Sequence, residues 1–138
     1  MKNKTIFILR GTSHSGKSTL ARELIKGRNG VICTADDLFE DINGNYNFDV
    51  SKLGFAHKQC QDKFVRALED IEVDIIVVAN TNCNPLDMEF YKREAEKTNA
   101  MIFFLVVERR HNNKNHHEIP LNVLGNQERR LSGSLKLI

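Results

Sequence analysis

A glycine-rich stretch carries the clearest chemistry in this sequence. Residues 11–18 read Gly-Thr-Ser-His-Ser-Gly-Lys-Ser, which fits the pattern G-x-x-x-x-G-K-S. In such a stretch the backbone N–H groups cradle phosphate, and the lysine reaches the β- and γ-phosphates of a nucleotide as a point charge. The serine hydroxyl can ligate Mg²⁺. We therefore expect ATP or another nucleotide to bind here, together with Mg²⁺. The expected binding residues are Gly11, Thr12, Ser13, His14, Ser15, Gly16, Lys17, Ser18 and Thr19.

The flanks of this stretch support the interpretation. Residues 5–9 form a short apolar run typical of a β-strand, and residues 19–25 carry their leucines and isoleucine on one face of a predicted helix. A strand, a glycine loop and a helix in this order are what the motif requires. The alternative, a Gly/Ser-rich turn before an ordinary helix, is disfavoured by these flanks. Within the loop, His14 is expected to be an exposed bystander rather than a phosphate sensor.

Paired carboxylates follow the second apolar run. Asp36 and Asp37 follow the run 31–33 after Thr34 and Ala35. The carboxyl ends of parallel strands line the ligand crevice of an open sheet. There, carboxylates can hold Mg²⁺ through water or accept a proton from an attacking hydroxyl. Alternatively, one of the two simply caps the next short helix.

The remaining pattern predicts an α/β fold. Apolar runs alternate with helical patterns, and two of these runs are continuous, as in strands buried on both faces of a parallel sheet. We predict a single domain over residues 1–138, with an open parallel sheet of about four to five strands and helices on both faces. Ser51 is expected to cap the first long helix, and Pro85 to stand at the first position of the next. The predicted strands are 5–9, 31–33, 75–79 and 101–107, and the predicted helices after the loop are 51–71, 85–98 and 121–131.

Composition bounds the class of protein. The chain has 138 residues, 41% of them hydrophobic and 28% charged, which is ordinary for a soluble globular domain. No stretch approaches the roughly 20 apolar residues of a membrane span, and no signal peptide is expected. The net charge of +2 is too small to argue for nucleic-acid binding by itself. The three cysteines lack a metal-ligand spacing and are expected to be reduced, buried thiols of a cytoplasmic protein.

Two polar segments interrupt the alternation. Residues 40–49 contain an Asn-Gly turn signal and are expected to form a small hairpin or an ordered loop. Residues 109–118 contain no apolar residue, and we expect a lid over about 109–119. The histidines at 111, 116 and 117 invite a zinc site, but their spacing and the absence of a nearby cysteine favour a polar loop. Arg129 and Arg130 are expected on a solvated helix face, with a phosphate contact left open.

The combination of motifs resembles a known group. The phosphate-binding loop, the Asp36-Asp37 pair and the Thr-Asn-Cys-Asn-Pro turn at 81–85 together resemble polynucleotide-kinase-type P-loop phosphotransferases. That group includes phage polynucleotide kinase and small AAA-type ATPases of phage and bacteria. The resemblance covers nearly the whole chain. It implies a P-loop NTPase fold and ATP- and Mg²⁺-dependent transfer of the γ-phosphate to a hydroxyl, either a polynucleotide 5′-hydroxyl or a nucleotide-like acceptor.

The resemblance also implies residue roles. Asp36 matches the catalytic aspartate that takes the proton from the 5′-hydroxyl, and Lys17 matches the phosphate ligand. Arg109 or Arg110 matches the lid arginines that stabilise the transferring phosphoryl group. The implied metal ligands are Ser18, Asp36 and Asp37, and the implied substrate residues are Asn80, Thr81 and Asn82.

Three positions depart from the kinase pattern. Asn80 stands where the kinases have an acidic residue, Phe39 where they have an arginine, and Ala79 where a Walker B aspartate could stand. The two aspartates after the second run would then organise the metal. These departures keep a second function open, an NTP-binding or NTP-hydrolysing regulatory or interaction protein without kinase activity. A third is a nucleic-acid binder that uses a basic lid, for which we expect salt-dependent binding.

Overall fold

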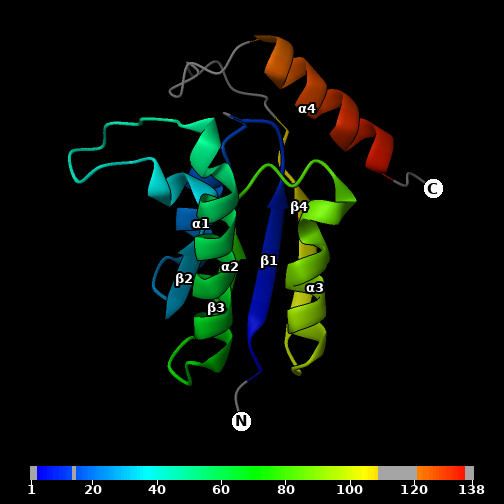
Figure 1. Cartoon of the computed structure of the whole chain (residues 1–138). Helices are drawn as coiled ribbons and strands as arrows, with labels where there is room; N and C mark the ends of the chain where they lie inside the picture. The colour runs from blue at the N-terminus through cyan, green and yellow to red at the C-terminus, as the bar shows by residue number, and fades with distance from the viewer. Residues whose placement is uncertain (1–2, 14, 109–120, 136–138) are drawn as a thin grey trace.

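A four-stranded parallel sheet forms the centre of the protein (Figure 1). The computed structural model describes residues 3–13, 15–108 and 121–135. The strands lie in the order β2-β3-β1-β4, and each pair of neighbours is parallel. Their bounds are Thr5–Arg10 for β1, Gly30–Cys33 for β2, Ile75–Val78 for β3 and Met101–Val106 for β4. The predicted α/β fold with an open parallel sheet is confirmed, with four strands in the described residues.

Helices cover both faces of this sheet, as predicted. Their bounds are Lys17–Ile25 for α1, Leu53–Glu69 for α2, Glu89–Glu96 for α3 and Leu121–Ser134 for α4, with short 3₁₀ turns at Ala35–Leu38 (η1), Val50–Lys52 (η2) and Pro85–Met88 (η3). On one face, α2 and α3 pack against alternate residues of β1, among them Ile6 and Ile8. On the other face, α1 packs against Leu9 of β1 and Val77 of β3. The helix α4 lies beyond the carboxyl ends of the strands (Figure 1).

The burial of the strands follows from their order. The central strand β3 is fully buried on both faces, which explains its uninterrupted apolar sequence. The run 101–107 was predicted to be buried in the same way, and this is wrong. Its residues Met101, Phe103, Phe104 and Val106 are 40–57% exposed, because β4 has a neighbour on only one side among the described residues.

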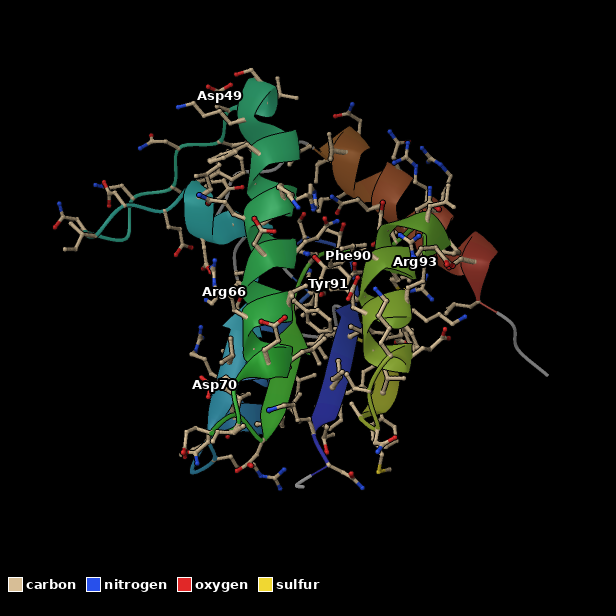
Figure 2. The ribbon with its side chains drawn as sticks, turned by 60° about the horizontal axis from the view of Figure 1, so that its bottom comes forward. Asp49, Arg66, Asp70, Phe90, Tyr91 and Arg93 are labelled. Atoms are coloured by element: carbon tan, nitrogen blue, oxygen red, sulfur yellow. The ribbon has the colours of Figure 1, made fainter. Side chains whose placement is uncertain are left out.

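The cap of the α2 segment differs from the prediction. Asp49, not Ser51, caps the turn η2 that leads into this helix, just before its amino end (Figure 2). The Asp49 carboxylate accepts hydrogen bonds from the Ser51 backbone N at 3.0 Å and from the Ser51 hydroxyl at 2.6 Å. Because a 3₁₀ turn precedes the helix, the cap lies two residues earlier than the apolar pattern indicated. Pro85, in contrast, does open its turn, η3, as predicted.

The interior between α2 and α3 holds the largest buried rings. Tyr91 of α3 lies between the two helices (Figure 2) and meets Phe64 of α2 edge to face, with ring centroids 5.0 Å apart. The Tyr91 hydroxyl donates a hydrogen bond to the Cys60 sulfur at 3.2 Å, so its polar end is satisfied inside the core. Cys33, Cys60 and Cys83 are free and buried.

The described helices do not fit a bilayer. None of those within residues 3–13, 15–108 and 121–135 is both long enough and apolar enough to cross a membrane.

Candidate functional site

The phosphate loop joins β1 to α1 and depends on its two glycines. Gly11 has no room for a side chain, since an added Cβ would lie 2.5 Å from the Val107 carbonyl oxygen and 2.6 Å from the Ser15 hydroxyl. Its N–H donates to the Thr81 carbonyl at 2.9 Å, which ties the loop to the end of β3. Gly16 caps α1 with a φ of +105°, a conformation that residues with a side chain rarely adopt. The sequence pattern therefore corresponds to two separate steric requirements.

Lys17 lies folded over this loop. Its Nζ donates to the carbonyl oxygens of Thr12 at 2.7 Å and Gly11 at 3.1 Å, and the residue is only 8% exposed. Burial lowers the pKa of Lys17 to about 8, and the Asp36 carboxylate opposes part of this shift. An ammonium held on backbone carbonyls can exchange these partners for phosphate oxygens, which are stronger acceptors for it.

The two aspartates lie on η1 at the carboxyl end of β2, and neither of them caps it. The Thr34 hydroxyl serves as the cap and accepts a hydrogen bond from the Asp36 backbone N at 3.2 Å. The capping alternative for the pair is therefore wrong, because the preceding threonine already performs that task. Asp36 accepts a hydrogen bond from the Tyr46 hydroxyl at 3.2 Å, and Asp37 pairs with Lys63 at 3.3 Å near solvent. Both residues line the cavity described below.

The three polar residues after β3 divide into two kinds. The Asn80 side chain accepts a hydrogen bond from the Ala35 backbone N at 2.8 Å, which ties the end of β3 to the start of η1. Its amide also donates to the Cys60 sulfur at 3.5 Å. Asn82 is 2% exposed, has a φ of +47°, and donates to the Leu9 carbonyl at 2.8 Å. Asn80 and Thr81 line the cavity described next. Asn82 is buried, and its side chain hydrogen-bonds to the backbone of β1.

A cavity of about 1110 Å³ connects these elements. One wall is the phosphate loop and the start of α1, another is η1 with its aspartates, and a third is the segment 39–48 with the facing side of α2. The predicted site residues that line it are Ser13, Gly16, Lys17, Ser18, Thr19, Asp36, Asp37, Asn80 and Thr81. Gly11, Thr12 and Ser15 are buried behind the loop surface. Three other predicted residues, His14, Arg109 and Arg110, lie outside the described residues, as does the whole lid segment 109–119.

The side chains that line the cavity fit Mg²⁺, which keeps several water ligands, better than a metal ion that needs all of its ligands from the protein. Among the described residues no group of three or more His, Cys, Asp or Glu side chains is arranged to hold an ion. Mg²⁺ does not need such a group, since it keeps several waters and binds through one or two carboxylates and substrate phosphates. Ser18, Asp36 and Asp37 line the same cavity and supply oxygen donors only. The histidines weighed for zinc lie outside the described residues.

Two residues at the loop were not predicted from the sequence. Arg10, which ends β1, is buried and donates to the Asn82 carbonyl at 2.8 Å and to the Ser134 hydroxyl of α4 at 2.6 Å. Gln127 of α4 accepts a hydrogen bond from the Ser13 backbone N at 2.8 Å and donates to the Ser13 hydroxyl at 3.1 Å. Together they tie α4 to the phosphate loop. Arg10 could have been noticed as a charge directly after an apolar run, but nothing in the sequence marks Gln127.

Comparison with known proteins identifies the fold. No protein-family model matches the chain. In solved structures, a chain of the Pnkp1/Rnl/Hen1 RNA repair complex aligns over 100% of this chain and 41% of its own length, with 23% identity and a TM-score of 0.59. A variant of the Mycobacterium tuberculosis APS kinase CysC aligns over 97% of this chain and 100% of its own, with 14% identity and a TM-score of 0.56. This chain has a P-loop kinase fold.

A human protein shares more of the sequence. This chain is 39% identical over 100 residues to NEDD4-binding protein 2 of Homo sapiens. The match covers 72% of this chain but only 6% of the human protein, so the chain corresponds to a small part of that relative. The P-loop kinase fold accounts for the position of the site, since the glycine loop follows the first strand and the other cavity walls follow the carboxyl ends of β2 and β3.

Proposed function

We propose that this protein is an ATP- and Mg²⁺-dependent phosphotransferase that moves the γ-phosphate to a hydroxyl acceptor, most favourably a polynucleotide 5′-hydroxyl or a nucleotide-like substrate. One observation carries the proposal. Lys17 of the phosphate loop and Asp36 of η1 line one cavity, and the carboxylate lies close enough to raise the lysine pKa against the effect of burial. In the proposed reaction Lys17 is the phosphate ligand and Asp36 is the base, and both residues line this cavity.

In the proposed reaction each of these groups has a separate task. The loop N–H groups and Lys17 hold the β- and γ-phosphates, while Asp36 accepts the proton of the acceptor hydroxyl. The hydroxyl oxygen forms a bond to the γ-phosphorus as the bond from that phosphorus to the β-γ bridging oxygen breaks, and ADP leaves. Ser18 with Asp36 or Asp37 would hold Mg²⁺, which would supply positive charge near the leaving group. Arg109 or Arg110 of the lid segment would add positive charge to the transferring group.

The similar proteins support an acceptor of this class. One solved neighbour belongs to an RNA repair complex, and another is the Mycobacterium tuberculosis APS kinase CysC in complex with AMPPNP and APS. The cavity volume of about 1110 Å³ lies slightly above the range of about 300–1,000 Å³ that is usual for small-molecule pockets.

The direct test is transfer of label from γ-labelled ATP. With Mg²⁺ and 5′-hydroxyl DNA and RNA oligonucleotides, we expect label on the oligonucleotide that depends on Mg²⁺ and is lost with a 5′-phosphorylated oligonucleotide. Measurement by gel separation distinguishes this product from free phosphate. Label only in free phosphate, for these and for nucleoside acceptors, would contradict the proposal.

That outcome would favour the second candidate, an NTP-binding regulatory protein. The contact between Ser13 and Gln127 motivates it. This pair joins α4 to the phosphate loop by hydrogen bonds. A nucleotide that changes the conformation of the loop would therefore also change the position of α4. Hydrolysis or binding without transfer would then serve to move this helix.

Nucleotide binding is expected to take up protons near pH 8. The pKa of Lys17 is about 8 because the ammonium is buried, so about half of the molecules carry a neutral lysine at that pH. A bound triphosphate stabilises the ammonium and raises this pKa, so binding at pH 8 should take up about half a proton per site. The uptake should vanish towards pH 6, where Lys17 is already protonated. Calorimetry in buffers of different ionisation enthalpy measures it.

The control for this prediction is Lys26→Met, which removes an exposed lysine just after α1 and should leave the uptake unchanged. Equal heats in all buffers at pH 8 would show that Lys17 does not change its protonation when the nucleotide binds.

A further inference from the structure

The cavity has an aromatic wall on the side of η1. Phe39, Tyr46 and Phe48 form a group in which the Phe39 ring lies 5.1 Å from that of Phe48 and 6.1 Å from that of Tyr46. All three line the cavity. Phe39 is 5% exposed and supports the others, whereas Phe48 is 51% exposed. A large apolar ring is therefore held in contact with solvent inside the site.

The hairpin that carries these rings is well ordered by local hydrogen bonds. Glu40 and Tyr46 form an antiparallel bridge, and the Asn47 backbone N donates to the Phe39 carbonyl at 2.8 Å. At the turn, the Asp41 carboxylate accepts from the backbone N of Asn43 at 2.9 Å and of Asn45 at 2.8 Å. Residues 40–49, expected to form a small hairpin or an ordered loop, form a loop closed by the single antiparallel bridge between Glu40 and Tyr46, which we call the hairpin. The Phe48 ring also packs on the buried Phe39 ring, which restricts its rotation and so lowers the entropic cost of binding.

The aromatic wall is connected to the candidate base. The Tyr46 hydroxyl donates to Asp36 Oδ1 at 3.2 Å, so the hairpin and the carboxylate share one hydrogen bond. This contact leaves Oδ2 for the acceptor hydroxyl. His57 and Lys63 of α2 also line this cavity. A ring stacked on this wall would lie in the cavity that Asp36 and Lys63 also line.

We propose that Phe48, supported by Phe39, stacks on the terminal nucleobase of the phosphoryl acceptor. The inference rests on the proposed transfer function, because it treats this wall as the acceptor side of the same cavity. Aromatic stacking tolerates any base, since every nucleobase presents a flat π-face. The site therefore selects a nucleobase-bearing acceptor without reading its sequence.

Fluorescence tests this stacking without requiring catalysis. The chain contains no tryptophan, so Phe48→Trp introduces a single indole at the proposed contact. A 5′-hydroxyl oligonucleotide is expected to quench this indole saturably, and an oligonucleotide with an abasic 5′-terminal nucleotide to quench it much less. The matched control is Ile42→Trp, which places the indole on the tip of the same hairpin, fully exposed and outside the cavity lining. Equal quenching of the two variants, or no quenching of Phe48→Trp, would overturn the proposal.

Kinetics supplies the second readout. Phe48→Ala is expected to raise KM for the oligonucleotide about tenfold or more, with kcat and KM for ATP little changed, and Phe48→Tyr should restore the wild-type KM. An unchanged KM in Phe48→Ala would overturn the proposal. If wild-type protein transfers phosphate but Phe48→Trp is not quenched, stacking fails and the proposed function stands. If quenching is specific but no transfer occurs with any acceptor, Phe48 binds a nucleobase, whereas the proposed transfer function fails and with it the assignment of that base to a phosphoryl acceptor.

Discussion

Replacing Asp36 with asparagine is expected to reduce phosphate transfer by at least about 100-fold, the usual effect of removing a general base. The amide keeps the size of the carboxylate and can still accept the hydrogen bond that the Tyr46 hydroxyl donates to Asp36, so the wall of the cavity should keep its shape. The change therefore removes proton acceptance with little loss of structure. ATP affinity, measured by calorimetry in parallel with labelled transfer, should change much less than the rate.

The matched control for this variant is Asp37→Asn. Asp37 stands next to Asp36 on η1, but it pairs with Lys63 near solvent and lacks the contact to the hairpin. We expect this variant to affect transfer chiefly by raising the Mg²⁺ concentration needed for half-maximal rate. An Asp36→Asn protein with wild-type transfer would exclude Asp36 as the base. If instead Asp37→Asn lost activity at saturating Mg²⁺, the role of the base would pass to Asp37.

Lys17→Met is expected to abolish measurable transfer and to weaken ATP binding about 10- to 100-fold, the loss of one or two charge-assisted hydrogen bonds to phosphate. The apolar side chain fills a similar volume over the loop. Since burial already lowers the pKa of Lys17 to about 8, the charged form is costly in this environment, and its removal should not unfold the loop. Calorimetry and labelled transfer measure the two effects.

Thermal unfolding separates a binding defect from a folding defect in this variant. Without nucleotide, the Tm of Lys17→Met should stay close to that of the wild type, whereas the rise in Tm on adding ATP and Mg²⁺ should be largely lost. A variant of Lys26, which lies exposed just after α1, should keep that rise. Retention of full ATP-induced stabilisation by Lys17→Met would contradict the assignment of Lys17 as a phosphate ligand.

The local parts of the site were predictable from the sequence. The phosphate loop is a contiguous pattern whose residue types follow from backbone sterics, and the structure gives a separate steric reason for Gly11 and for Gly16. The position of Asp36 at the cavity was also predictable, because residues after parallel strands gather at one edge of the sheet. Both inferences needed only sequence neighbours and the period of the apolar residues.

The long-range parts were not predictable, because they depend on which segments meet. Gln127 reaches Ser13 across 114 positions of sequence, and Arg10 reaches Ser134 across 124. The exposure of β4 depends on its place at the edge of the sheet, which its own apolar residues do not encode. The sequence marks Phe39 only as a departure from the kinase pattern. Its contact with the ring of Phe48 depends on the fold of the segment between them.

Because the three free thiols are buried, their rates of alkylation can report how often the surrounding structure opens. Burial raises the pKa of Cys33 at the end of β2 to about 12, and it also raises the pKa of Cys60 in α2, so neither reacts readily with alkylating reagents while the fold is closed. Cys83 lies beside the phosphate loop, with its sulfur 3.8 Å from the Gly11 carbonyl oxygen. The alkylation rate at each position thus measures how often that region opens. Nucleotide in the loop should slow modification of Cys83 first, and mass spectrometry of the modified peptides can follow all three cysteines in one unmutated sample.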